Sequence, residues 1–81
     1  MSRDWRFYVD DMVQACEKIA RYVSGMDKAA FLGDEKTYDA VLRNLEVIGE
    51  AAKQLPESIR NRHPSTEWRK IGGFRDVVAH A

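Results

Sequence analysis

The sequence predicts an all-α protein: one small domain, residues 1–81, folded as an antiparallel, up-and-down helical bundle. Three observations support this prediction. Apolar residues recur every three or four positions over two long stretches, which is typical of amphipathic helices. The alternation of apolar and polar residues that would indicate strands is almost absent. The length of 81 residues, with 44% hydrophobic and 32% charged positions, suits a single ordered domain with a small core.

The first long stretch runs from Trp5 to Val23. Its apolar residues form one continuous stripe of about five helical turns. Ser24 and Gly25 follow, and glycine is the usual residue just past the C-terminus of a helix. Cys16 lies on this stripe, so we expect it to be a buried structural thiol rather than a nucleophile.

The second long stretch starts at Tyr38 and stops at Pro56. Asp34 or Glu35 is expected to begin this helix, because acidic residues suit a first helical turn. Between the two helices, residues 24–33 are expected to form a short helical turn at one end of the core.

The C-terminal part of the chain has a shorter and more interrupted pattern. Pro56 suits the first position of a helical turn, and a second turn contains Trp68. The amphipathic segment that starts at Phe74 has only about two turns, so the C-terminal helix is predicted to be incomplete. Because it is too short to cover both long stripes, either a C-terminal helix is missing or a second subunit covers them. We expect a homodimer.

Charge is balanced over the whole chain but not along it. The 13 basic and 13 acidic side chains exclude a polybasic nucleic-acid binder. Residues 1–52 contain seven basic and ten acidic side chains, whereas residues 53–81 contain six and three. If the protein binds an anion, the C-terminal third is where the site is expected, whereas charge alone favours a solvated basic face. The candidate residues are Arg60, Arg62, Arg69, Lys70 and Arg75, with His63 and His80.

The sequence lacks the patterns that are typical of several classes of protein and site, so these classes are excluded. A single cysteine rules out a disulfide framework and suits a reducing compartment. No apolar run approaches the ~18 residues that span a bilayer, and the N-terminus has no signal-peptide core, so we expect a cytoplasmic protein. The spacings of metal sites and the glycines of a phosphate-binding loop are absent, so we expect no metal and no cofactor. Paired carboxylates such as Glu46 and Glu50 are interpreted as solvated or salt-bridged helix faces.

The remaining candidate chemistry lies in residues 75–80. On a helix, Asp76 and His80 share a face, so the carboxylate can orient the imidazole. Arg75 and His80 are about 140° apart around the axis, so a two-fold dimer is needed to bring both into a shared cleft. Two imidazoles and two guanidiniums suit RNA cleavage by a 2′-hydroxyl, which needs a base, an acid and a cation beside the phosphorane. The alternative is a surface arginine and a helix-end histidine that interacts with the helix dipole.

Three blocks of the sequence form a longer, ordered pattern. The blocks are 40–51 (AVLRNLEVIGEA), then Pro64 followed by 68–71 (WRKI), and 73–80 (GFRDVVAH). In order and spacing they resemble the motifs of the HepT-type toxins of the HEPN superfamily. With the first helix included, the resemblance covers nearly the whole chain.

The resemblance implies a HEPN-type bundle that dimerises around an Arg-x4-His motif. It also implies a metal-independent ribonuclease, the toxin of a type VII toxin–antitoxin system. The substrate would be RNA and not DNA, the partner a minimal nucleotidyltransferase antitoxin, and no membrane would be involved. By carry-over, Arg75 and His80 are the catalytic pair and Asp76 supports them. Arg69 and Lys70, just before the motif, are candidate RNA-binding residues.

The sequence departs from the family pattern in two places. Asp76 stands where asparagine is commoner, which puts a negative charge beside bound phosphate. The chain ends at Ala81, one residue before the tyrosine that the antitoxin adenylylates in the family, so no modification tyrosine is predicted. The alternative hypothesis is a catalytically inactive or truncated HEPN-type binding module that pairs with a nucleotidyltransferase. Retention of Arg75 and His80 favours the ribonuclease, and a plain helical interaction protein is the third hypothesis.

Overall fold

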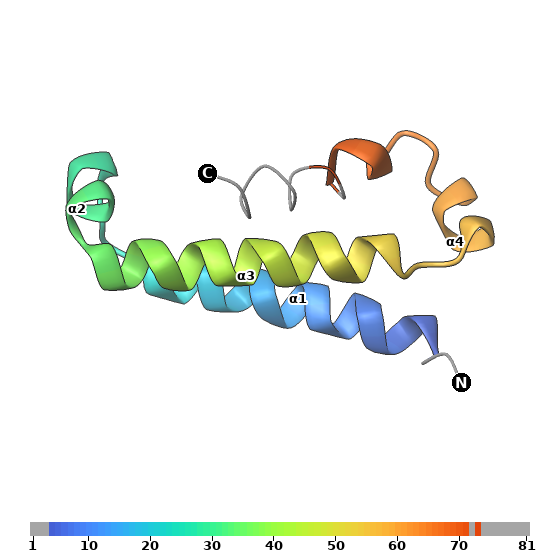
Figure 1. Cartoon of the computed structure of the whole chain (residues 1–81), viewed down its shortest axis with the longest axis horizontal. Helices are drawn as coiled ribbons and strands as arrows, with labels where there is room; N and C mark the ends of the chain where they lie inside the picture. Colours follow the sequence, from blue (N-terminus) through green and yellow to red (C-terminus); the bar gives the residue numbers. More distant parts are fainter. Residues whose placement is uncertain (1–3, 72, 74–81) are drawn as a thin grey trace.

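Two long antiparallel helices form the body of the protein (Figure 1). The computed structural model describes residues 4–71 and 73 of the chain. In it, α1 (Trp5–Tyr22) and α3 (Glu35–Lys53) lie side by side along their lengths. The short helix α2 (Lys28–Gly33) connects them at one end and contacts α3. The two predicted long helices and the short helical turn between them are confirmed.

A shorter helical pair follows at the other end of the body. Helix α4 (Glu57–Asn61) lies beyond the C-terminal end of α3, and the helical segment 68–71 comes back alongside α3 (Figure 1). The described residues contain no strand, so the predicted all-α class is confirmed for this part of the chain. Among the described helices, none combines the length and the apolar character needed to cross a membrane. The predicted C-terminal segment from Phe74 lies outside the described residues.

The boundaries of α1 follow ordinary capping chemistry. The Asp4 carboxylate accepts hydrogen bonds from the backbone N–H of Arg6 at 2.9 Å and from the Arg6 guanidinium at 3.0 and 2.9 Å. The side-chain hydrogen bond from Arg6 is the main reason that the pKa of Asp4 is lowered to about 2. Past the other end, Gly25 has φ of 76°, a left-handed conformation that glycine adopts readily. The predicted stop after the first stripe is therefore confirmed.

The start of α3 is equally well defined. The Asp34 carboxylate accepts a hydrogen bond from the backbone N–H of Thr37 at 3.1 Å, and this bond lowers the pKa of Asp34. The predicted helix start at Asp34 or Glu35 is confirmed. Pro56 was predicted to be the first residue of α4, but it immediately precedes the helix. The helix begins at Glu57, one residue later than predicted.

The core between α1 and α3 is built from small side chains. Its buried apolar residues are Ala15, Val41, Ala51, Ala52 and Leu55. Alanine lets two helices approach closely, but it brings little apolar area, so part of the stripe on α1 stays uncovered. Val13 is 48% exposed, and Cys16 is exposed as well. The prediction that Cys16 is buried is therefore wrong, because the stripe is wider than the part of α1 that α3 covers.

Candidate functional site

The predicted catalytic residues lie outside the part of the chain that the structure describes. These are Arg75, Asp76 and His80, so their mutual geometry stays a prediction. The two candidate RNA-binding residues, Arg69 and Lys70, lie on the described segment 68–71. The candidate site is therefore built from this segment and from α4.

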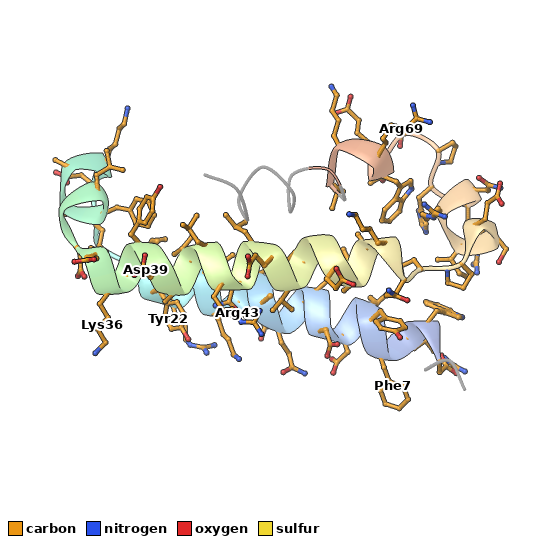
Figure 2. All side chains as sticks on the ribbon, viewed as in Figure 1. Phe7, Tyr22, Lys36, Asp39, Arg43 and Arg69 are labelled. Carbon is orange, nitrogen blue, oxygen red and sulfur yellow. The ribbon has the colours of Figure 1, made fainter. Side chains whose placement is uncertain are left out.

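Arg69 and Lys70 are both exposed but have different surroundings. The Lys70 ammonium is 3.0 Å from a carboxylate oxygen of Glu67, which partly neutralises its charge. Arg69 forms no ion pair with any carboxylate of the described residues. Figure 2 shows Arg69 at the same end of the molecule as α4.

Arg69 lines a depression between the segment 68–71 and α4, here called the α4 depression. Its volume is about 380 Å³. It is lined by Glu57, Arg60, Asn61, Trp68 and Arg69. Arg60 of α4 and Arg69 of the segment 68–71 thus line the same depression as the Trp68 indole ring, although Arg60 and Trp68 are eight positions apart in the sequence.

Trp68 fixes the position of the segment relative to α4. Its indole Nε1–H donates to the backbone carbonyl oxygens of Arg60 and His63, each at 3.1 Å. These bonds hold the half-buried ring in one orientation at the edge of the α4 depression. The sequence predicted a turn around Trp68 but not this link, because the partners are backbone atoms across an irregular loop.

Arg60 and Arg62 carry charges that no carboxylate of the described stretches neutralises. Arg60 is half-buried, and its Nε–H is shielded from water without a hydrogen-bond acceptor. Arg62 is exposed. With Arg69, these residues make the α4 end of the molecule a region of positive potential. The charge asymmetry of the sequence predicted this region, but not which of its cations meet.

A second, apolar hollow lies on the other side of Trp68, here called the α1–α4 groove. Its volume is about 500 Å³. Its lining includes the uncovered part of the α1 stripe, with Val13 and Cys16 among its members. From the α4 end it is lined by Leu55, Ile59, Arg62, His63 and Trp68.

The remaining acidic residues behave as expected of solvated helix faces. Glu46 pairs with Arg43 at 3.5 Å, and Asp10 accepts a hydrogen bond from Gln14 at 2.7 Å. Within the described residues, no group of three or more histidine, cysteine or acidic side chains is placed to hold a metal ion.

Comparisons with known proteins agree on one family. The family model described as "Ribonuclease HepT-like" matches residues 12–81. The chain is 38% identical over its full length to a protein of Thermococcus cleftensis named "Probable ribonuclease HepT", and it covers 74% of that protein. It is 38% identical over 96% of its length to a "Putative RNase" of Methanocaldococcus jannaschii, covering 64% of it.

A third relative gives a similar match. This "Putative RNase" of Caldanaerobacter subterraneus is 37% identical over 93% of the chain, which covers 67% of it. The chain thus spans about two thirds to three quarters of the length of these relatives. No solved structure gives a significant match.

Proposed function

The chain belongs to the ribonuclease HepT-like family, and from this premise we propose that it is a ribonuclease that cleaves RNA without a metal ion. One observation carries the proposal. The family match extends from residue 12 to residue 81 and so includes the predicted catalytic residues Arg75 and His80. Relatives named as ribonucleases over nearly the whole chain support it.

The proposed reaction uses the RNA's own 2′-hydroxyl as nucleophile. One His80 imidazole takes the hydroxyl proton, and a second imidazole protonates the leaving 5′-oxygen. Arg75 guanidinium groups stabilise the charge that develops on the phosphorane. The products are a 2′,3′-cyclic phosphate and a 5′-hydroxyl. Asp76 supports the reaction by orienting the imidazole of His80.

The mechanism needs two imidazoles, and each chain offers one His80. We therefore propose a two-fold homodimer in which both copies contribute to one cleft. The uncovered apolar stripe of α1 supports association in general, because one short chain hides little of it. Sedimentation at micromolar concentration is expected to give twice the monomer mass, and a stable monomer would contradict the dimer.

The proposed biological setting is a toxin–antitoxin pair with a minimal nucleotidyltransferase as antitoxin. The chain's membership of the HepT-like family supports this setting. Co-expression with a nucleotidyltransferase encoded beside it should yield a complex that co-purifies. Two proteins that elute separately under low and high salt would contradict the pairing.

The test of the activity uses purified protein, single-stranded RNA and excess EDTA. Cleavage is expected to continue in EDTA, to leave a cyclic phosphate, and to spare DNA of the same sequence. His80→Ala should lower the rate by ~10²–10⁴-fold, because it removes the proton transfers. His63→Ala is the matched control, since it removes the other histidine and should leave the rate unchanged. Cleavage that stops in EDTA, or that persists in His80→Ala, would overturn the assignment.

A further inference from the structure

The α4 depression combines one fixed indole ring with two guanidiniums that pair with no carboxylate of the described residues. We propose that it is a subsite for single-stranded RNA, in which Arg60 and Arg69 bind phosphates and Trp68 stacks on a base. This inference rests on the proposed ribonuclease function and extends it to nucleotides that flank the cleaved bond. None of the subsite residues belongs to the predicted catalytic set.

The charges of the depression are available to a ligand. On the long helices, Arg6 pairs with Asp4 at 2.9 Å and Arg43 with Glu46 at 3.5 Å. Arg60 and Arg69 have no such partner among the described carboxylates. A guanidinium presents several N–H donors in a plane, which matches the oxygens of a phosphate group.

Arg60 is less exposed to water than Arg69. It is half-buried, and its Nε–H is shielded from water with no acceptor among the described residues. A cation in this condition gains more from a nearby anion than a fully solvated one does, because solvent screens it less. Arg69, which is exposed on the segment 68–71, supplies the second cation of the depression.

Trp68 supplies the surface for a base. Its Nε1–H bonds to Arg60 and His63 fix the plane of the ring, so little conformational freedom is lost when a base stacks on it. Aromatic side chains next to basic groups are the usual means of holding single-stranded nucleic acid. A base inside a duplex is already stacked and cannot reach the ring, so the subsite selects single strands.

The polar residues of α4 complete the subsite. Asn61 can both donate to and accept from a base edge. The Glu57 carboxylate repels phosphate and accepts hydrogen bonds from base amino groups. Phosphates are therefore expected next to Arg60 and Arg69. The base is expected next to Trp68, Asn61 and Glu57.

The first test measures binding without cleavage. The probe is a single-stranded 2′-O-methyl oligonucleotide of roughly ten nucleotides, which has no free 2′-hydroxyl nucleophile. The double variant Arg60→Gln/Arg69→Gln should bind it at least ~10-fold more weakly. Its plot of log affinity against log salt should be shallower by about 1.4, or about 0.7 for each lost phosphate contact.

The matched control is Arg21→Gln. It removes the same kind of side chain from the last turn of α1, where that helix approaches α2. Its affinity and salt dependence should stay within about twofold of the wild type. Equal weakening in the control and the double variant would overturn the subsite, since general electrostatic attraction would then explain the binding.

The second test observes stacking directly. The chain has two tryptophans, so Trp5→Phe leaves Trp68 as the only one. Titration of this variant with the same oligonucleotide should quench its fluorescence, and a duplex of the same sequence should quench it much less. Fluorescence that does not change while binding is saturated would overturn the stacking role of Trp68.

The outcomes separate this inference from the ribonuclease proposal. Binding and quenching as described, in a protein that cuts no RNA, would support the subsite and overturn the proposed function. Cleavage of RNA with an unchanged KM in Arg60→Gln/Arg69→Gln would support the function and overturn the subsite. If both hold, the double variant should raise KM at least ~10-fold for RNA that is long enough to occupy the depression as well as the cleavage site.

Discussion

The α1–α3 pair and the α4 end of the molecule differ in how many of their polar, charged and apolar side chains have partners within the protein. In the long pair, the helix starts are capped by Asp4 and Asp34, and all but one of the buried apolar residues identified lie there. Around α4, the arginines have no carboxylate partner among the described residues, an apolar groove stays open, and the helix itself buries no residue. One part of the chain thus contains most of the core, and the other contains the cations that we propose bind RNA.

This division has a physical cause. A core of alanines and a few larger residues brings a small stability, and an 81-residue chain has little to spare. Exposed arginines such as Arg62 and Arg69 need no ion pair for stability, because water solvates them. The α4 end can therefore carry these two cations without weakening the fold, and substitutions in the two regions should have different consequences.

The largest expected effect on stability is at Leu55, where the two regions meet. Leu55 is 3% exposed, and Leu55→Ala should lower the free energy of unfolding by about 2–5 kcal/mol. Leu32→Ala is the matched control, because Leu32 is 56% exposed on α2 and its loss should cost under about 0.5 kcal/mol. Urea denaturation measures both, and similar losses would show that the core does not reach Leu55.

A smaller effect is expected where Trp68 joins the segment 68–71 to α4. Trp68→Phe keeps an aromatic ring, smaller than the indole, but removes the Nε1–H donor; the lost hydrogen bonds should cost about 0.5–1.5 kcal/mol. Both carbonyl oxygens keep a second donor, from the backbone N–H of His63 at 3.0 Å and of Thr66 at 3.1 Å, so neither is left unpaired. Thermal denaturation measures the change, and Trp5→Phe serves as the control for loss of an indole elsewhere.

A pH-dependent effect is expected at the start of α3. The Asp34 pKa is lowered by its hydrogen bond from Thr37, so this carboxylate stabilises the fold above its unfolded pKa of about 3.9. That contribution should disappear as the pH falls through the lower folded value. Asp34→Ala should therefore lower the urea midpoint at pH 7 and converge with the wild type in acid. Asp34→Asn keeps the acceptor oxygen and should lose only the pH dependence.

The smallest effect on stability is expected in the cationic cluster itself. Arg60→Gln and Arg69→Gln should each change the free energy of unfolding by no more than about 0.5 kcal/mol, because neither breaks an ion pair with a described residue. Urea denaturation of the variants used for RNA binding tests this directly. A large decrease in the free energy of unfolding of Arg60→Gln would mean that the packing of the Arg60 side chain stabilises the fold.

The same contrast explains which predictions from sequence succeed. The long helices were predictable because apolar spacing, an acidic cap and Gly25 all act within a few residues of each other. The exposure of Cys16 was not, because it depends on how much of α1 the small side chains of α3 cover. The meeting of Arg60, Trp68 and Arg69 was not predictable either, since an irregular loop brings them together.

The candidate site was predictable only in its broad location. Charge along the chain indicated the C-terminal third, and Arg60, Arg62 and Arg69 lie there without an ion-pair partner among the described residues. Lys70, a candidate of equal standing in the sequence, pairs with Glu67 instead. The roles of Arg75 and His80 stay predictions, since they lie outside the described residues.

The exposed thiol of Cys16 makes the α1–α4 groove chemically addressable. It is the only cysteine in the chain, so a maleimide probe will label the protein at one position, inside the groove and away from the α4 depression. The labelling rate then reports coverage of the groove in solution. A labelling rate that falls as protein concentration rises would identify a second copy as the cover, whereas a constant rate would mean that association of two copies leaves the groove open.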